Sequence, residues 1–366
     1  MSITRTPAPQ NAHLKRIVIK VGTSSLITDG EVDQRKLATL VEAVAKLRTD
    51  GHQILLVASG AIALGDVRLN RHAEGRAGSR QLAAAIGQGL LFDAFRCSLE
   101  ENGLQAAQFL LTPFDLTGPD HRDGVRDALE EALDRGWVPV VNENDAVMVR
   151  NNDVLASLLS ATLGAGLLVL LTDVSGLYES DPRQSTDARR IPVVDAMTPE
   201  VEHLAGSPVE GPGTGGMPTK LCAVWIATLA GVACVIAGAS VADSIEGAVR
   251  GENVGTLVRP RQPKKRADLG QLWRALSAAP TGRLLCNPSA VAAAADGRPL
   301  TKGHVQASEG NFKSGDVVDV VVDSHGVIAR GRSSVAAPDM SQVAPRQLAD
   351  GQVVLHPSDY ISLLES

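Results

Sequence analysis

Short apolar runs alternate with longer amphipathic stretches over the first two-thirds of the chain. The apolar runs have the length and composition of strands that are buried in a parallel sheet. They lie at residues 16–21, 53–59, 137–142, 167–173 and 232–238. Apolar residues recur at helical spacing at residues 34–51, 122–136 and 219–231. This alternation predicts an α/β fold, an αβα sandwich with helices on both faces of a mainly parallel central sheet.

One segment raises the question of a membrane span. Residues 154–171 carry no charge, and their length is at the lower limit for a spanning helix. However, Gly164, Ala165 and Gly166 interrupt the apolar run, and Asp173 follows it. A helix, a turn and a buried strand explain this pattern better. We therefore expect the segment to lie in the protein interior and predict no membrane association.

The pattern changes near residue 260. Residues 259–280 are proline-rich and basic and include a short helix-like piece. Strand-like runs follow at 282–286, 315–331 and 351–357, and Ser-His-Gly at 324–326 indicates a hairpin turn. We predict a disordered N-terminal tail (1–14), a first domain (15–260), a linker (261–279) and a small β-rich domain (280–366).

Composition narrows the class of protein. The formal net charge is −6, whereas proteins that bind nucleic acid without specificity are normally basic. The four cysteines are scattered without a C-x-x-C pair, which favours a reducing compartment over a disulfide framework or a zinc site. The N-terminal stretch has no apolar core of a signal peptide. We expect a cytoplasmic protein for which nucleic acid is not the main partner.

Polar, glycine-rich segments follow the predicted strands. They lie at residues 20–24, 59–61, 142–145, 151–153 and 172–183. Ligands of open α/β sheets bind beyond the carboxyl ends of the strands, so these segments predict a site at one sheet edge. Taken singly, each has a structural alternative, because glycines end strands and Asn or Asp caps helices.

Two lysines stand out. Lys20 lies within an apolar strand, and an unpaired buried ammonium is costly, which favours contact with an anion over a structural salt bridge. Lys220 ends the stretch "GTGGMPTK" (213–220), which is not a P-loop because Thr219 precedes the lysine and Leu221 follows it. Two lysines and glycine N–H groups at one edge would suit a polyanion such as a nucleoside triphosphate.

Several of these segments together resemble one family. The motifs are "VIKVGTSSL", "SGAIALG", "RQLAAAIGQ", "VPVVNENDAV", "LTDVSGLYESDPR" and "GTGGMPTKLCAV". In this order they resemble the glutamate 5-kinases of the amino-acid kinase superfamily, over roughly residues 15–260. Residues 310–331 resemble part of a PUA domain, which many bacterial members carry at the C-terminus.

The resemblance implies an activity. It implies transfer of the ATP γ-phosphate to the side-chain carboxylate of L-glutamate, with Mg²⁺, as the first step of proline biosynthesis. It also implies proline as a feedback inhibitor and a homo-oligomer, dimer or tetramer, formed through the kinase domain.

The resemblance also implies roles for individual residues. Lys20 and Lys220 would stabilise the transferring phosphoryl group, and Asp153 would orient both lysines. The glutamate-binding residues would be Ser59 for the α-carboxylate, Asp145 for the ammonium and Asn152 for the rest of the molecule. Backbone N–H groups beside the phosphoryl group would come from Gly22 and Gly60. The ATP site would comprise Lys20, Thr172, Asp173, Thr214, Gly215, Gly216, Met217, Pro218, Thr219 and Lys220.

The chain departs from the family pattern in three places. The loop at 147–153 is short, with Arg150 and Asn151 in place of Gly-Asp. Pro218 replaces a small polar residue, and "GVRDAL" (124–129) replaces an Asn-Ala-Arg pattern. None of these changes removes a charged catalytic group, but the short loop could alter glutamate affinity or proline inhibition.

Other functions stay open from sequence. The chain could be another amino-acid kinase, acting on acetylglutamate or aspartate. It could instead be a regulatory or RNA-binding homologue that works through the PUA-like domain, although aromatic residues are scarce. An inactive homologue is a third alternative because of the shortened loop.

Overall fold

The structure is a computed structural model of the chain. It describes residues 16–72, 79–148, 151–180, 185, 187–204, 216–239, 243–261, 267–340 and 349–364. The predicted N-terminal tail, residues 1–14, lies outside the described residues. The described part contains a large sheet of eight strands and a second sheet of five strands, with two further two-stranded ladders.

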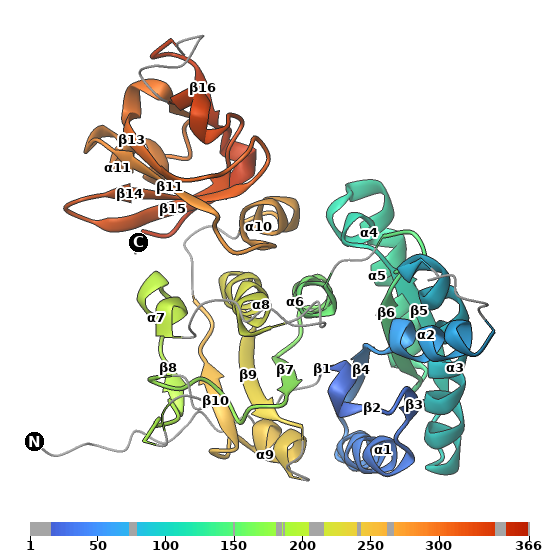
Figure 1. The fold of residues 1–366 in the computed structure, drawn as a ribbon. Helices are drawn as coiled ribbons and strands as arrows, with labels where there is room; N and C mark the ends of the chain where they lie inside the picture. Colours follow the sequence, from blue (N-terminus) through green and yellow to red (C-terminus); the bar gives the residue numbers. More distant parts are fainter. Residues whose placement is uncertain are drawn as a thin grey trace, which may run out of the picture.

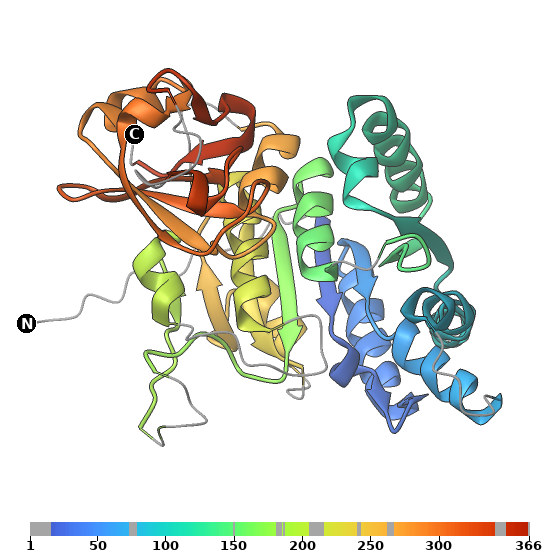
Figure 2. The same cartoon turned by 45° about the horizontal axis from the view of Figure 1, so that its top comes forward.

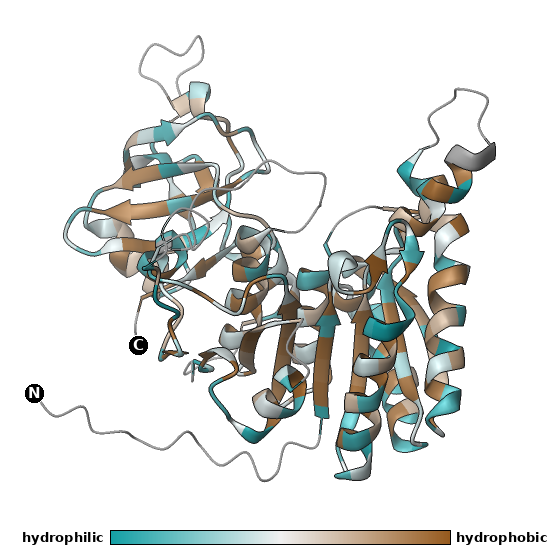
Figure 3. Ribbon diagram, turned by 60° about the horizontal axis from the view of Figure 1, so that its bottom comes forward, coloured by the Kyte–Doolittle hydropathy of each residue, from teal (hydrophilic) through white to brown (hydrophobic). Residues whose placement is uncertain are grey.

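The large sheet confirms the predicted fold class. Its order is β5-β6-β4-β1-β7-β9-β10-β8 (Figure 1). The strands are β1 (Arg16–Val21), β4 (Gln53–Ala58), β5 (Ala106–Leu111), β6 (Val138–Glu143), β7 (Leu167–Thr172), β8 (Val193–Val194), β9 (Ala233–Gly238) and β10 (Gly255–Val258). Neighbouring strands are parallel except β10, which pairs antiparallel with β9. Central strands are apolar over nearly their whole length, as Figure 3 shows.

Helices cover both faces of this sheet. Along β1, Ile17 and Ile19 belong to one apolar cluster and Val18 to the other. The first cluster includes residues of α1 (Gln34–Thr49), α2 (Ala61–His72), α3 (Arg80–Glu101) and α9 (Ser244–Arg250). The second includes residues of α4 (Pro113–Thr117), α5 (Pro119–Asp134), α6 (Asn152–Thr162) and α8 (Met217–Leu229). The remaining helix of this part is α7 (Pro199–Leu204), and a short hairpin of β2 (Ile27–Thr28) and β3 (Glu31–Val32) follows the 3₁₀ turn Thr23–Ser25.

Two glycines bring α2 and α3 into close contact. A Cβ on Gly65 would lie 1.8 Å from the carbonyl oxygen of Ala83, and a Cβ on Gly87 would lie 1.8 Å from that of Ala61. Any side chain at either position would therefore push the helices apart. Since α2 begins directly after β4, this contact fixes α3 beside the carboxyl end of β4.

The uncharged segment 154–171 is interior, as expected. It forms most of α6, a turn in which Gly164 has φ +58°, and strand β7. Among the described residues one helix, α3, is long and apolar enough to cross a membrane by length and composition alone. Core helices pass this test too, and α3 buries Ala83, Leu91 and Phe95.

The C-terminal part is β-rich, as predicted. Its sheet has the order β13-β11-β14-β15-β17, and the antiparallel pair β14–β15 encloses the predicted hairpin turn. The strands are β11 (Gly282–Cys286), β12 (Leu300–Thr301), β13 (Val305–Gly310), β14 (Val317–Val322), β15 (Gly326–Arg332), β16 (Val353–Leu355) and β17 (Tyr360–Ser362). The remaining elements are α11 (Ser289–Ala295) and the 3₁₀ turns Lys302–His304, Ala337–Met340 and Pro357–Asp359.

A helix lies inside the predicted linker. This helix, α10 (Leu269–Leu276), buries Leu272, Trp273 and Leu276. It packs against α4, α6 and α8 on one side and against β15 and β17 on the other (Figures 1 and 2). The segment thus holds the two parts together instead of merely connecting them. The boundaries 15–260 and 280–366 stay predictions.

A buried ion cluster, here called the junction cluster, joins the two parts. Arg330 of β15 contacts Asp319 of β14 (Nε–Oδ1 2.7 Å) and Glu202 of α7 (Nη1–Oε1 3.0 Å and Nη2–Oε2 2.7 Å). The indole N–H of Trp225 donates to the same Glu202 at 3.2 Å. Burial alone would lower the pKa of Arg330, but the two carboxylates reverse this and hold it above its usual value. Residues of both parts are therefore bound at one point.

Candidate active site

The carboxyl ends of the central strands open on one cavity of about 540 Å³. Predicted site residues that line it are Lys20, Gly22, Ser59, Gly60, Asp145, Asn152, Asp153, Thr172, Asp173 and Lys220. They come from the ends of β1, β4, β6 and β7 and from the first turns of α6 and α8. The structure thus brings together side chains that are up to 200 residues apart in sequence, while their chemical roles stay predictions.

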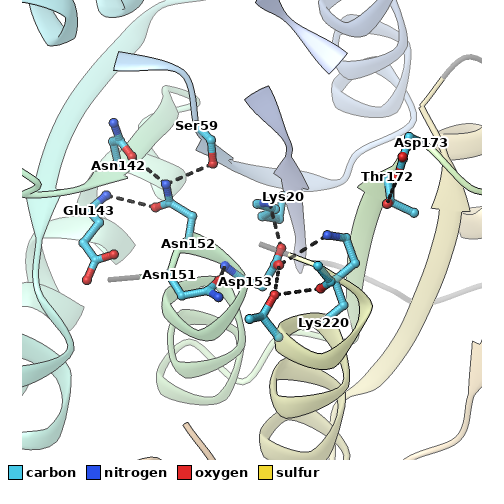
Figure 4. A network of polar contacts seen from close by, with 12 residues as sticks. Lys20, Ser59, Asn142, Glu143, Asn151, Asn152, Asp153, Thr172, Asp173 and Lys220 are labelled. Carbon is cyan, nitrogen blue, oxygen red and sulfur yellow. Dashed lines mark hydrogen bonds and ion pairs between the residues drawn. The ribbon is translucent and has the colours of Figure 1, made fainter. Parts of the chain in front are cut away.

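Asp153 holds both predicted lysines (Figure 4). Its Oδ1 lies 2.8 Å from Nζ of Lys20, and its Oδ2 lies 3.4 Å from Nζ of Lys220. The hydroxyl of Thr219 donates to Oδ2 at 3.3 Å. Asp153 is fully buried, whereas the lysines keep 5% and 6% exposure toward the cavity. We call these three charged residues the lysine cluster.

Burial and charge act against each other in this cluster. Burial raises the pKa of Asp153, but the two ammonium groups outweigh it and hold that pKa below its usual range. Burial lowers the pKa of Lys20, the Asp153 carboxylate opposes this, and the ammonium of Lys220 adds to the lowering. Lys20 thus makes a buried salt bridge with Asp153, which from sequence was the alternative to contact with an anion. Two cations against one carboxylate nevertheless leave a net charge of +1, which favours an incoming anion.

A second polar group lies on the other side of the cavity. The Nδ2 group of Asn152 donates to Oγ of Ser59 at 3.0 Å and to Oδ1 of Asn142 at 2.8 Å (Figure 4). Its Oδ1 accepts from the backbone N–H of Glu143 at 3.0 Å. Asn152 is well placed at the cavity despite the shortened loop before it. Of that loop, Arg150 lies outside the described residues, and Asn151 caps α6 by accepting from the N–H of Asp153 at 2.8 Å.

Asp145 provides a carboxylate at the same end. It follows β6, and burial raises its pKa to about 6, against an opposing effect of Arg80. Arg80 begins α3 and lines the same cavity. Sequence reasoning did not single out Arg80, although it opens the motif "RQLAAAIGQ". A largely ionised carboxylate at neutral pH suits an ammonium group.

The first turn of α8 lies on the side of the cavity that is lined by Lys220. Gly216 caps this helix, and Lys220 falls in its first turn as expected, with its N–H bonded to the carbonyl of Gly216. Pro218 also lies in the first turn, where its missing N–H leaves no bond unmade. Met217 and Thr219 complete this turn, whereas Thr214 and Gly215 lie outside the described residues.

The remaining predicted residues line the same cavity. Thr172 ends β7 and donates to Asp173 at 3.0 Å. Gly22 follows β1, and a Cβ there would lie 3.8 Å from Nζ of Lys20. Gly60 has φ +126°, a conformation that L-residues rarely adopt, and a Cβ there would meet Ile27 at 2.9 Å. Glycine is thus required at residue 60 by the backbone itself.

Comparison with known proteins finds two family domains and a similar fold. The Amino acid kinase family matches residues 15–238, and the PUA domain matches residues 282–350. Among solved structures, carbamate kinase from Giardia lamblia bound to AMP-PNP has a TM-score of 0.51 at 17% identity, covering 68% of this chain and 100% of its own. At this identity the likeness shows the fold alone.

Relatives align over nearly the whole chain. "Glutamate 5-kinase" of Moorella thermoacetica is 36% identical over 94% of this chain and 93% of its own length. "Glutamate 5-kinase" of Streptococcus suis is 35% identical over 95% of this chain and 99% of its own. The chain therefore belongs to the glutamate 5-kinase family of the amino acid kinases and carries a PUA domain after its kinase domain.

Proposed function

We propose that this chain transfers the γ-phosphate of ATP to the side-chain carboxylate of L-glutamate, forming glutamyl 5-phosphate, the first step of proline biosynthesis. The near full-length match to glutamate 5-kinases supports this activity. The observation that carries it within the structure is the net positive lysine cluster at the rim of a cavity whose other end holds a carboxylate, a hydroxyl and an amide.

Glutamate binds between Ser59, Asn152 and Asp145. The Ser59 hydroxyl bonds the α-carboxylate, and Asp145 pairs with the α-ammonium. A buried carboxylate favours a substrate with a free ammonium over acetylglutamate, whose acylated nitrogen carries no charge. The side-chain carboxylate of glutamate then points toward the lysine cluster.

Phosphoryl transfer needs no general base in this arrangement. The glutamate carboxylate is already ionised at neutral pH and attacks the γ-phosphorus directly. The main barrier is the approach of two anions, which Lys20 and Lys220 relieve while Asp153 keeps both ammonium groups in place. Backbone N–H groups of Gly22 and Gly60 would add donors to the same oxygens.

ATP occupies the side of the cavity formed by Thr172, Asp173 and the first turn of α8. The N–H groups at the N-terminus of α8 would then be available to bind the phosphates. Mg²⁺ would bind at this site together with the phosphates of ATP. Among the described residues there is no group of three or more His, Cys, Asp or Glu side chains that would hold a metal, and Mg²⁺ is usually held by phosphate oxygens and water.

Two exposed surfaces support a homo-oligomer formed through the kinase domain. Leu82, Ile86 and Leu90 are exposed on α3 at spacings of four, and Leu110 is exposed on the neighbouring edge strand β5. Side chains four residues apart lie next to one another on a helix, and exposed apolar patches mark sites of protein–protein contact. We also propose a cytoplasmic location, in keeping with four free cysteines, and feedback inhibition by proline.

A coupled ADP-release assay tests this function. We expect turnover with ATP, Mg²⁺ and glutamate, little with aspartate or acetylglutamate, and inhibition by added proline. Turnover that prefers acetylglutamate or aspartate would replace the substrate assignment, and no turnover with any of the three would overturn the activity. In a parallel filter assay we expect no tight binding of structured RNA at physiological salt.

A further inference from the structure

Three amide side chains form a row from α3 to the cavity. The row begins at Gln88, continues through Asn142 and Asn152, and ends at the hydroxyl of Ser59. Asn142 is almost fully buried at 2% exposure, so its amide has little access to water. Figure 4 shows Asn142, Asn152 and Ser59 pointing toward one another from three different elements.

The backbone fixes the orientation of the amide nearest the cavity. The N–H of Glu143 can only donate, and it points at Asn152 at 3.0 Å. Asn152 must therefore present its Oδ1 to this N–H and turn its Nδ2 group the other way. Both hydrogens of that group are then used, by Ser59 at 3.0 Å and Asn142 at 2.8 Å.

The same polarity continues to α3. Asn142 accepts from Asn152 through Oδ1, so its own Nδ2 group faces away and donates to Oε1 of Gln88 at 2.7 Å. Gln88 thus presents an acceptor to the row, in agreement with the direction that the backbone imposes at the other end. The close contact of Gly87 with the carbonyl of Ala61 holds Gln88 at this place.

This direction determines what Ser59 can do. Its oxygen already accepts a hydrogen bond from Asn152, so the hydroxyl hydrogen is available to the cavity. We propose that Gln88 and Asn142 are positioning residues: they hold Asn152 in one orientation and thereby make Ser59 a hydrogen-bond donor that selects a carboxylate. The proposal rests on the assignment of Ser59 to the α-carboxylate of glutamate made above.

The polarity of the row can be reversed and restored by substitution. Gln88→Lys places a donor where Asn142 needs an acceptor, so one amide in the row must lose a partner. We expect KM for glutamate to rise roughly tenfold or more, with KM for ATP unchanged. Gln88→Glu keeps an acceptor and should keep KM for glutamate near the native value. The double variant Gln88→Lys/Asn142→Asp should restore KM, because the carboxylate that replaces the middle amide would accept from both neighbours.

Controls separate this effect from unfolding and from added charge. Gln81→Lys adds the same charge on the exposed side of α3 and should leave both KM values unchanged. Gln88→Met removes the acceptor without adding charge and should raise KM for glutamate several-fold even if the lysine variant does not fold. Thermal unfolding of each variant is recorded beside its kinetics.

The outcomes distinguish this proposal from the function on which it rests. If Ser59→Ala leaves KM for glutamate unchanged, the assignment of Ser59 to the substrate is wrong. If Ser59→Ala raises KM but Gln88→Met and Gln88→Lys do not, the positioning role alone is wrong. If the double variant is no better than Gln88→Lys, polarity does not explain the effect and the proposal fails.

Discussion

The lysine cluster and the junction cluster are both buried and both line a cavity, but they differ in charge balance. The lysine cluster has two cations and one carboxylate, and its lysines border a cavity. The junction cluster has one guanidinium and two carboxylates, with contacts to both partners and an added bond from Trp225. A buried cluster with excess positive charge beside a cavity suits an anionic ligand, whereas an arginine paired with one carboxylate from each part of the fold holds the two parts together.

The largest expected effect is on the stability of the junction. Arg330→Met leaves Asp319 and Glu202 buried without their cation, which we expect to lower the free energy of unfolding by about 3–5 kcal/mol. Turnover of the folded enzyme should change only a few-fold. Denaturant unfolding and the ADP-release assay measure the two quantities. The exposed pair of Arg298 provides a control, since Arg298→Met should cost less than about 1 kcal/mol. Equal effects of the two substitutions would contradict the structural role.

For the lysine cluster we expect a loss of activity with little change in stability. Lys20→Ala and Lys220→Ala should each lower kcat at least a hundredfold, a loss of about 3–4 kcal/mol of transition-state stabilisation, while the protein stays folded. Circular dichroism and kcat are measured on the same preparations. Lys46→Ala, at a side chain that is 59% exposed, is the matched control. Near-native turnover of either cluster variant would remove it from the phosphoryl site.

Proton binding at Asp145 sharpens the comparison, because burial outweighs the effect of Arg80 on this carboxylate and raises its pKa. Its pKa of about 6 means that it becomes neutral as pH falls through this value and then attracts ammonium poorly. We expect KM for glutamate to rise by about tenfold per pH unit below pH 6, since the carboxylates of glutamate itself stay ionised there. Asp145→Asn should raise KM and remove this dependence. A native KM that is constant from pH 5 to 8 would contradict the role of Asp145.

The smallest effect concerns the indole of the junction cluster. Trp225→Phe removes the hydrogen bond to Glu202 but keeps an aromatic ring near Arg261 and Arg330. We expect a loss of about 1 kcal/mol in the free energy of unfolding with kcat within a few-fold. A large fall in kcat would instead show that the junction acts on Lys220, which lies on the same helix.

The central sheet could be predicted because its strands are buried on both faces. Residues 17–19 and 167–171 are apolar throughout, which is typical of such strands. Strand β5 has no such run because it lies at the edge of the sheet and alternates exposed and partly buried residues. Helix α3 was not predicted either, since it places apolar residues on its exposed side as well as its buried one.

The candidate site also has a part that could be predicted from the sequence and a part that could not. Lys20 lies near the end of β1, and Ser59 and Asp145 come soon after β4 and β6, so the topology of the sheet brings all three to one edge. The bond between Gln88 and Asn142 could not be predicted, because it depends on how closely α3 approaches α2. That distance is set by Gly65 and Gly87, whose effect appears only when the two helices are packed.

The fluorescence of Trp225 can report whether the two domains of the protein are docked. Its side chain is completely buried between the two parts. Of the other two tryptophans, Trp137 is 40% exposed and Trp273 is 8% exposed. Separation of the PUA domain from the kinase domain would bring the Trp225 indole into water and shift its fluorescence to longer wavelength. With Trp137 and Trp273 replaced by phenylalanine, the emission of the remaining indole would follow the docking of the two domains in real time, without any attached dye.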